Sequence, residues 1–446
     1  MNKQLNIQWN FHLPPISATK WHTWSGPDAQ VYEVDEIILM ACKKGLNRFH
    51  GWDLSGIEPK ALNQWILAAS IYKRGVMTRV DHQPQKTLHI SGAYNIHFSE
   101  NQSIPWKYLP KESFYVIDKN VLEAWPELKK LRYTITTNLT EANKNFASVK
   151  MIENEWIKFN RPCDWVIIGG GITGDTAAFA ANLNQCQFKL VPTTLLAMAD
   201  ACIGGKTGVN VKGHGKNQIG RFAFPSEVLC WSGWLKTLPK REFKSGLAEC
   251  LKHGLLANDP IILNNPNQYE SAENIQLSWL KQVVQVKSKV VAQDPAEQGV
   301  RATLNLGHTL AHALEAISHE QDSSEYLHHG EAVAIGLLFS SYLSYYVKVC
   351  EYSTYEKVEK ALKSSDCLIT PKMLMEYTGH KNLESAEFWN HIMKYLQKDK
   401  KNRGSHSHWV LLKELGETAT QNNSPTIPLE YSTVQRAWNS FINKYQ

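Results

Sequence analysis

Four histidines in residues 301–334 have a spacing that suits a metal site. His308 and His312 are four residues apart in a run of helical apolar periodicity, so both imidazoles leave the same helix face. His328 and His329 open a second apolar run, 331–343. Histidines on one helix and at the head of the next can converge on a zinc-like ion. A single histidine is more often an ordinary core or surface residue, but this clustering favours a site.

The anionic ligand that such a site needs must come from elsewhere in the chain. The predicted helix GLAECLKHGL, 246–255, places Glu249 and Lys252 three residues apart on one face. They supply a carboxylate ligand and a nearby cation. Taken singly, each residue would equally suit a solvated helix face.

Further ionisable residues precede the histidines. A predicted helix, 283–291, carries Lys287 and is followed by Glu297. Arg301 and Asn305 come on the turns before His308, and we expect one helix to align Arg301, Asn305, His308 and His312 along one side.

A glycine-rich turn joins a predicted strand to a predicted helix. CDWVII, 163–168, is apolar at nearly every position, as a central parallel strand should be. It runs into GGGITGD, 169–175, where glycines would let backbone N–H groups approach a pyrophosphate. The turn is not GxGxxG, so by itself it leaves a nucleotide site and an ordinary turn both open.

Two further glycine loops carry cations. Asp200 and Lys206 flank a Gly-Gly pair, and Gly215, Lys216 and Asn217 form a second predicted turn. Lysines and free amides there could bind a phosphate or a cofactor. Solvated loops also carry lysines, but two such loops in one short stretch favour a site.

The predicted elements suggest how these residues are positioned. Strands at 113–118, 133–137, 163–168 and 188–191 alternate with predicted helices such as Val121–Leu131 and Ala142–Lys158, a pattern typical of a parallel sheet with crossover helices. After Pro239 the chain is mainly helical, with a short strand predicted near the end. The fold class is therefore α/β plus all-α. We divide the chain into an N-terminal extension of unknown role (1–87), an α/β domain (88–238) and a helical domain (239–446).

Composition excludes several classes of protein. The 446 residues are 43% hydrophobic and 20% charged, and the net charge of +6 is dispersed, which argues against nucleic-acid binding. The first residues contain no apolar signal stretch, and no apolar run is long enough to span a membrane. The eight cysteines form no CxxC pair, as expected for reduced thiols. We therefore expect a cytoplasmic protein.

Several of these segments, taken in order, resemble motifs of the dehydroquinate synthase family of sugar phosphate cyclases. The matching segments, which cover roughly 94–412, are GGGITGD, VPTTLLA, DACIGGKTGVN, GKNQIG, LKTLPKREF, GLAECLKHGL, RATLNLGHTLAHALE and HGEAVAIGL. The resemblance implies a Rossmann-like NAD-binding domain followed by a helical metal-binding domain.

The resemblance also implies site residues. It assigns zinc or cobalt to Glu249, His308 and His329, the last because the family motif is His-Gly-Glu-Ala-Val. NAD contacts fall on Asp118, Glu141, Lys144, Gly170, Gly171, Asp175, Thr193, Thr194, Lys216 and Thr237. Substrate contacts fall on Asp200, Lys206, Asn217, Lys252, Lys287, Arg301, Asn305, His312 and one of Lys400 or Lys401. Glu297 occupies the position of a proton acceptor.

The implied activity is that of a phosphate-eliminating cyclase of the shikimate pathway. It would convert 3-deoxy-arabino-heptulosonate 7-phosphate to 3-dehydroquinate by transient oxidation with NAD, phosphate elimination, re-reduction and aldol closure. Alternatives are a sedoheptulose 7-phosphate cyclase, a metal-dependent alcohol dehydrogenase and an inactive binding protein. Retention of all three metal ligands argues against the last.

The chain departs from the family in two places. Family members usually carry an arginine after the helix that follows the glycine-rich turn, and it reaches the substrate phosphate of the neighbouring subunit in a homodimer. Residues 175–189 contain no arginine, and Asn184, Gln185 and Cys186 occupy the region. The N-terminal extension, with predicted helices at Tyr32–Lys44 and Lys60–Lys73, holds five tryptophans and no ionisable cluster. We expect it to serve packing or partner contact, so deleting Met1–Gln83 should impair solubility or assembly more than chemistry.

Overall fold

The computed structural model describes residues 4–12, 48–49, 52–53, 76–79, 88–99, 103–159, 163–211, 215–265, 267–321, 325–397 and 406–445. The chain divides into two units. The first comprises 1–193, 201–231 and 291–296, and the second comprises 194–200, 232–290 and 297–446. The helices predicted at Tyr32–Lys44 and Lys60–Lys73 lie outside the described residues.

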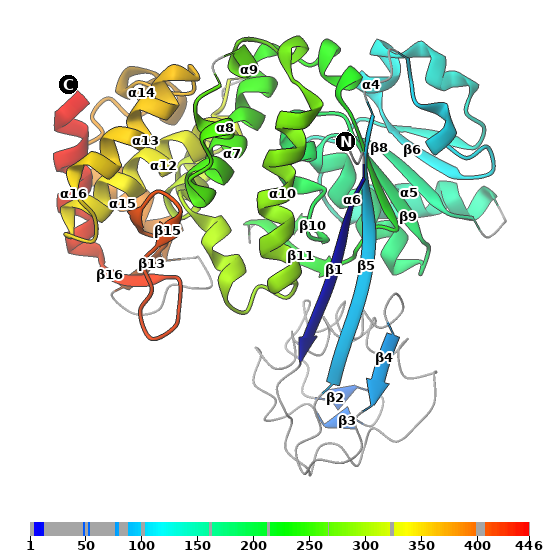
Figure 1. Cartoon of the computed structure of the whole chain (residues 1–446), viewed down its shortest axis with the longest axis horizontal. Coiled ribbons are helices and arrows are strands. Elements are labelled where there is room, and N and C mark those ends of the chain that lie inside the picture. The colour runs from blue at the N-terminus through cyan, green and yellow to red at the C-terminus, as the bar shows by residue number, and fades with distance from the viewer. Residues whose placement is uncertain are drawn as a thin grey trace. The chain divides into compact units, whose positions relative to one another are not determined.

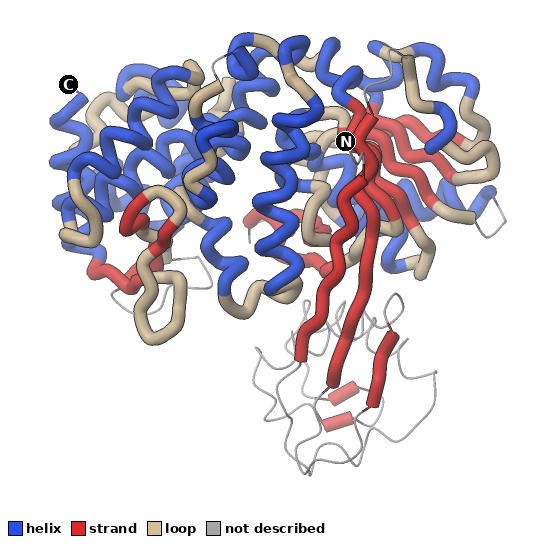
Figure 2. The backbone as a smooth tube through the Cα atoms, viewed as in Figure 1, coloured by secondary structure: helices blue, strands red, loops and turns tan. Residues whose placement is uncertain are grey.

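The first unit is built on an eight-stranded sheet of order β1-β5-β12-β9-β8-β6-β7, with β4 paired to β5 (Figures 1 and 2). From β5 to β7 the strands are parallel, whereas β1 and β4 run antiparallel to β5. The strands are β1 (Gln4–His12), β4 (Val76–Arg79), β5 (Leu88–Ser99), β6 (Phe114–Asp118), β7 (Thr134–Thr137), β8 (Trp165–Gly169), β9 (Phe188–Pro192) and β12 (Glu227–Trp231). The predicted parallel sheet is therefore present, and β8 is buried along its whole length.

Part of the N-terminal extension belongs to this sheet. Each residue of β1 pairs with a residue of β5 between His89 and His97. A short hairpin, β2 (Arg48–Phe49) and β3 (Trp52–Asp53), is also described. β1 thus covers an edge of β5 that would otherwise be open to association with another strand.

Helices of the first unit differ from the predicted ones for local reasons. The helix predicted at Val121–Leu131 is interrupted before Pro126, whose ring cannot continue it, and becomes α4 (Lys119–Ala124) followed by a 3₁₀ turn, η2 (Pro126–Lys130). The helix predicted from Ala142 begins later, as α5 (Phe146–Phe159), because the Asn145 side chain caps it by accepting hydrogen bonds from two backbone amides. The remaining elements are η1 (Trp106–Tyr108), α6 (Gly171–Leu183), and the hairpin of β10 (Lys206–Val211) and β11 (Gly215–Phe222). The turn predicted at residues 215–217 is instead the start of β11.

The second unit is helical. It contains α7 (Lys240–Ala257), α8 (Pro260–Leu263), α9 (Asn267–Glu270), α10 (Leu277–Gln293), α11 (His308–Ser318), α12 (His329–Tyr346), α13 (Tyr352–Ser364), α14 (Pro371–Thr378), α15 (Ala386–Leu396) and α16 (Tyr431–Tyr445). Its short elements are η4 (Ser232–Thr237), η5 (Ala272–Asn274), η6 (Val300–Asn305), β13 (His406–Trp409), β14 (Leu412–Glu414), β15 (Glu417–Thr418) and β16 (Ile427–Glu430). A π-helix, η3 (Ala197–Ala201), begins within residues 194–200 of this unit and ends at Ala201, the first residue of 201–231. Helix α12 is apolar on nearly all sides and packs against α7, α11, α13 and α16, which makes it the core of this unit.

Two glycines let the start of α11 approach α12. Gly307 has φ of +80°, and a Cβ there would lie 2.7 Å from the Leu337 backbone nitrogen. A Cβ on Gly336 would lie 2.0 Å from the Gly307 carbonyl oxygen. Gly307, with its left-handed backbone, is the N-cap of α11 and separates this helix from η6, which ends at Asn305. The single helix predicted to run from Arg301 to His312 is therefore wrong.

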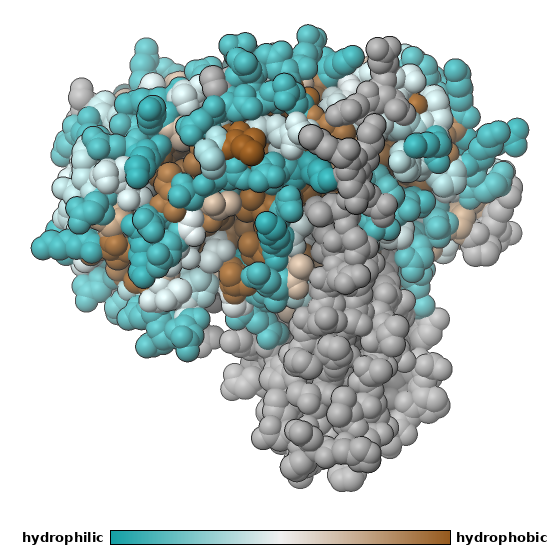
Figure 3. All heavy atoms as spheres, in the orientation of Figure 1, coloured by the Kyte–Doolittle hydropathy of each residue, from teal (hydrophilic) through white to brown (hydrophobic). Residues whose placement is uncertain are grey.

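Where side chains are described, the face drawn in Figure 3 is mainly hydrophilic, with small brown areas between teal ones. Among the described residues, none of the helices combines the length and apolarity needed to cross a bilayer.

Glu320, just after α11, contacts three side chains of α15. These contacts predict how the stability of the protein depends on pH in the acid range. Its carboxylate accepts hydrogen bonds from Lys394 (2.8 Å) and Tyr395, and Oε2 lies 2.6 Å from His391 Nε2. Burial would raise the pKa of Glu320, but these hydrogen bonds lower it to about 2. A carboxyl whose pKa is lowered on folding contributes stability above its unfolded value of about 4.3, and this contribution is lost as pH falls toward 2.

We therefore expect Glu320→Gln to lower the Tm modestly near neutral pH, because the carboxylate is 37% exposed and partly screened. The difference in Tm from the parent should shrink between about pH 4.5 and pH 2. Thermal unfolding followed by circular dichroism over this range measures it, and a pH-independent difference would contradict the assignment.

Candidate active site

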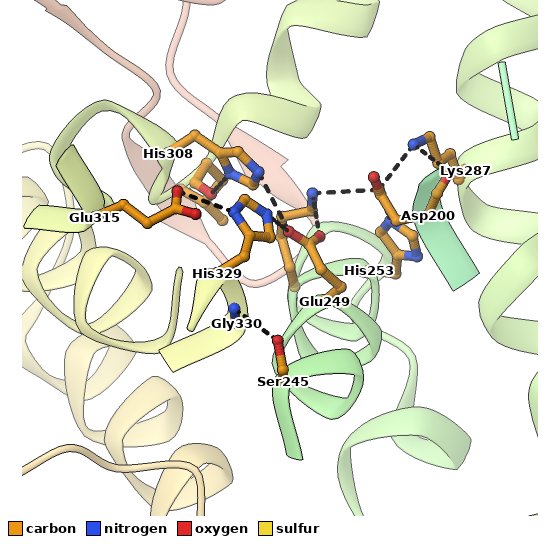
Figure 4. A network of polar contacts seen from close by, with 11 residues as sticks. Asp200, Ser245, Glu249, His253, Lys287, His308, Glu315, His329 and Gly330 are labelled. Atoms are coloured by element: carbon orange, nitrogen blue, oxygen red, sulfur yellow. Dashed lines mark hydrogen bonds and ion pairs between the residues drawn. The ribbon is translucent and has the colours of Figure 1, made fainter. Parts of the chain in front are cut away.

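Three helices of the second unit bring together a carboxylate and two imidazoles. Glu249 Oε1 on α7 lies 3.2 Å from His308 Nε2, the first residue of α11, and 3.3 Å from His329 Nε2, the first residue of α12 (Figure 4). Among the described residues this trio is one of two groups whose ligand atoms lie within 4.8 Å of one another. Glu249 is fully buried, and its Oε1, which lacks a hydrogen-bond partner, faces the two ring nitrogens, a donor set suited to a divalent cation. The site that sequence reasoning assigned to these residues therefore fits a metal ion.

Close backbone packing sets the positions of these helices. The Gly330 amide donates to Ser245 Oγ (2.9 Å), and a Cβ at Gly330 would lie 2.0 Å from the Ser245 carbonyl oxygen (Figure 4). The residue after His329 must therefore be glycine for α12 to begin against α7. His328, the N-cap of α12, instead places its Nδ1 3.3 Å from Glu242 Oε1, outside the trio.

The electrostatics of the trio suit ligation. Burial would raise the pKa of Glu249, but the Lys252 ammonium in contact with Oε2, together with His308, holds it well below its usual range. Burial and Lys252 lower the pKa of His308, which favours the neutral ring that a metal ligand needs. Burial would lower the pKa of His329, but Glu315 and Glu249 raise it to about 10. Ligation of a metal would displace that proton, since the ligand is neutral imidazole.

A second cluster surrounds Asp200. Its Oδ1 lies 2.8 Å from Lys287 Nζ, 3.6 Å from Lys252 Nζ and 3.5 Å from His253 Nε2. Burial would raise the pKa of Asp200, but the two ammonium groups and His253 hold it well below its usual range. Asp200, Glu249 and His253 form the other candidate metal group. The two lysines oppose a cation there and instead suit an anionic ligand.

The other predicted substrate residues of this unit are placed on separate elements. Arg301 is buried in η6 and is one of the charges that lower the pKa of Lys287. Asn305 Nδ2 donates to Glu297 Oε1 (3.2 Å). His312 is exposed on α11, and its ring centroid lies 5.4 Å from that of His308. Lys400 and Lys401 lie outside the described residues.

The first unit gathers most of the residues predicted to contact NAD. Lys144 Nζ donates to Asp175 Oδ2 (2.6 Å) and Asn217 Oδ1 (2.7 Å). Asn210 Nδ2 donates to Glu141 Oε1 (2.7 Å), and the Asn217 amide donates to Asn210 Oδ1 (2.8 Å). One hydrogen-bonded network thus ties the start of α6 to the β10–β11 hairpin.

Further predicted NAD and substrate residues lie around this network or in the second unit. Lys216 Nζ is 3.9 Å from Glu141 Oε1, and Asp118 Oδ2 accepts from the Thr173 hydroxyl (3.0 Å). Lys206 is exposed at the start of β10. Thr193 is buried after β9. In the second unit, Thr194 Oγ1 accepts from the Ala197 amide (3.1 Å), and Thr237 donates to the Trp234 carbonyl (3.2 Å).

The glycine-rich turn has the geometry of an anion-binding helix start. Gly170 is the N-cap of α6 and makes no side-chain hydrogen bond to the first turn, so backbone amides there are available to a ligand. A Cβ at Gly171 would lie 3.2 Å from Ala201 Cβ, so the turn is closely packed. These residues can receive a dinucleotide pyrophosphate.

Sequence reasoning missed two buried residues of the second unit, Glu315 and His253. Glu315 Oε2 lies 3.3 Å from His329 Nδ1. His253 is fully buried, and its Nε2 lies 3.5 Å from Asp200 Oδ1. Helical spacing held a signal for both, because His253 is four residues after Glu249 and Glu315 is seven after His308.

The chain thus combines a glycine-rich turn on a parallel sheet with a candidate metal group on helices. The family models described as 3-dehydroquinate synthase N-terminal and 3-dehydroquinate synthase C-terminal match residues 134–245 and 246–402. The 3-dehydroquinate synthase of Pelagibacter ubique (strain HTCC1062) is 36% identical over 315 residues, which cover 69% of this chain and 80% of that protein. That of Legionella pneumophila (strain Corby) is 42% identical over 230 residues, covering 50% and 61%. The chain belongs to the 3-dehydroquinate synthase family, which confirms the resemblance seen in its sequence.

Solved structures confirm the predicted fold. A 2-deoxy-scyllo-inosose synthase complexed with carbaglucose-6-phosphate, NAD⁺ and Co²⁺ matches with a TM-score of 0.64 at 22% identity, covering 82% of this chain and 99% of that one. The 2-epi-5-epi-valiolone synthase of Streptomyces hygroscopicus subsp. jinggangensis 5008, with NAD⁺ and Zn²⁺ bound, has the same TM-score and identity and covers 82% and 100%.

Proposed function

We propose that Glu249, His308 and His329 hold the catalytic divalent metal of a 3-dehydroquinate synthase. The observation that carries the assignment is the convergence of two Nε2 atoms on one buried carboxylate oxygen that has no hydrogen-bond partner. The chain is an NAD- and metal-dependent lyase of the shikimate pathway that eliminates phosphate and closes a carbocycle. Its metal is zinc or cobalt, as in the related structures with bound NAD⁺.

We assign NAD binding to residues 88–238 and metal and substrate binding to residues 239–446, with residues 1–87 as a packing extension. The predicted NAD contacts around Lys144 and the turn at Gly170 support the first assignment. When bound, NAD accepts and returns a hydride while the metal polarises the substrate oxygens.

The chain's own residues then have defined tasks. Lys252 and Lys287 present buried ammonium groups beside Asp200 and can hold an anionic substrate group. Arg301 can hold a carboxylate through two parallel hydrogen bonds. Glu297, held by Asn305, is the proposed proton acceptor. His312 is the proposed proton-transfer group. In the other unit, Lys206 and Asn217 are proposed substrate contacts.

The substrate is a small phosphorylated sugar, and we propose the seven-carbon acid 3-deoxy-arabino-heptulosonate 7-phosphate. Three buried cations, Lys252, Lys287 and Arg301, lie in the same region as two carboxylates, Asp200 and Glu249. These three cations, together with the metal, suit a substrate with more than one negative group. We also propose a cytoplasmic homodimer, as the family resemblance implies.

Turnover assays test this function. The purified protein, with NAD and zinc or cobalt, should release phosphate from the heptulosonate phosphate while the absorbance of reduced nicotinamide shows no net increase. Stoichiometric reduced nicotinamide would instead indicate a metal-dependent alcohol dehydrogenase. Turnover of sedoheptulose 7-phosphate but not of the acid would overturn the substrate assignment.

A further inference from the structure

The two histidines of the trio differ in what holds their second ring nitrogen. Both direct Nε2 to Glu249, and His329 Nδ1 lies 3.3 Å from Glu315 Oε2 (Figure 4). His308 Nδ1 instead lies 3.1 Å from the Leu306 carbonyl oxygen. One ring is thus held by a neutral acceptor two residues away in sequence. The other is held by a carboxylate from a neighbouring helix.

Glu315 occupies a place where a carboxylate is costly without such a partner. Its side chain is 9% exposed on α11, two turns after His308 on the same helix. Burying an ionised carboxyl is unfavourable unless hydrogen bonds or opposite charge compensate it. The contact with His329 offers both, and it crosses from the helix of one proposed ligand to the helix of the other.

We infer that Glu315 is a positioning residue that aims His329 at the metal and strengthens it as a ligand. The inference rests on the proposed metal site. A carboxylate that accepts the Nδ1–H fixes the tautomer in which Nε2 carries the lone pair, and it makes the ring a better donor. His308, held by a carbonyl, is oriented without that added negative charge. Glu315 therefore acts on the metal through one ligand only.

Two substitutions separate orientation from charge. Glu315→Gln keeps an oxygen that can accept from Nδ1–H but removes the charge, whereas Glu315→Ala removes both. Removing a group that hydrogen-bonds to a metal-binding histidine lowers metal affinity by about 10- to 100-fold. We expect about a tenfold loss of affinity in Glu315→Gln and a larger loss in Glu315→Ala. Dissociation constants for Zn²⁺ and Co²⁺ are measured by competition with a chromophoric chelator, without substrate or NAD.

Glu320→Gln is the matched control. It also removes a carboxylate that contacts a histidine ring, just after the end of the same helix, but His391 belongs to neither candidate metal group. This variant should bind both ions as the parent does. The visible spectrum of bound Co²⁺, which reports the ligand field, should change in Glu315→Gln and remain unchanged in Glu320→Gln.

The inference would be overturned if Glu315→Gln bound Zn²⁺ and Co²⁺ within about twofold of the parent and its cobalt spectrum were unchanged. It would also be overturned if Glu320→Gln lost as much metal affinity as Glu315→Gln. Glu315→Gln conserves size and shape, so the test stands even where Glu315→Ala does not fold. His308→Ala distinguishes this failure from failure of the proposed function. If His308→Ala still binds metal normally, the metal site itself is wrong. If it loses the metal while Glu315→Gln does not, only the role of Glu315 is wrong.

Discussion

Replacing His308 with alanine is expected to remove the metal and reduce kcat by on the order of a thousandfold or more, because the chemistry depends on a Lewis acid at this position. His308 Nε2 and His329 Nε2 lie 3.2 Å and 3.3 Å from Glu249 Oε1. With one donor missing, Glu249 and His329 cannot complete the three-ligand set typical of catalytic zinc. Elemental analysis of the purified variant gives metal content, and phosphate release gives activity.

The neighbouring histidine pair provides a matched control. His328→Ala removes an imidazole adjacent in sequence to a proposed ligand, but His328 contacts Glu242 rather than Glu249. It should keep one metal per chain and most of the activity. A His308→Ala protein with unchanged metal content would contradict the ligand assignment, as would loss of metal in His328→Ala alone.

The parallel sheet was predictable because its strands are short, apolar and separated by helices. Strand β8 is buried on both faces, and its sequence is apolar at nearly every position. Helix boundaries were less predictable. Asn145 marks the start of α5 and Pro126 marks the break after α4. Apolar periodicity alone does not detect either signal, so the predicted helices extended beyond these residues.

The identity of the candidate site residues could be predicted from motifs, but the distances between them, which helix packing sets, could not. Type and spacing singled out His308 and the pair His328 and His329, and the family motif favoured His329 within that pair. The distances of His308 and His329 to Glu249 depend on how α7, α11 and α12 cross. Those crossings depend on Gly307, Gly330 and Gly336, whose need for close contact is invisible in a single sequence. Glu315 was missed because its position on an apolar helix resembles an ordinary solvated carboxylate.

Arg301 remains a predicted substrate contact, but the continuous helix expected to position it is interrupted. A continuous helix from Arg301 to His312 was expected to align the substrate groups, but η6 ends at Asn305 and Gly307 redirects the chain. What the structure offers instead is burial and charge. The Arg301 side chain is 1% exposed and lies close enough to Lys287 for its charge to contribute to lowering the pKa of that lysine, after the larger effect of burial.

Arg301→Leu is accordingly expected to reduce kcat/KM for the acid substrate by on the order of a hundredfold, the worth of one charged hydrogen-bonded pair. A guanidinium can bind a carboxylate through two parallel hydrogen bonds, whereas an ammonium binds it as a point charge, so Arg301→Lys should recover only part of the loss. Steady-state kinetics with the heptulosonate phosphate and with sedoheptulose 7-phosphate, which lacks the carboxylate, provide the comparison. Because the lost contact is to the carboxylate, the variant should discriminate less between the two sugars than the parent does. Equal losses for both substrates would assign Arg301 to packing or to the phosphate instead, and Arg301→Lys with full activity would show that charge alone is enough.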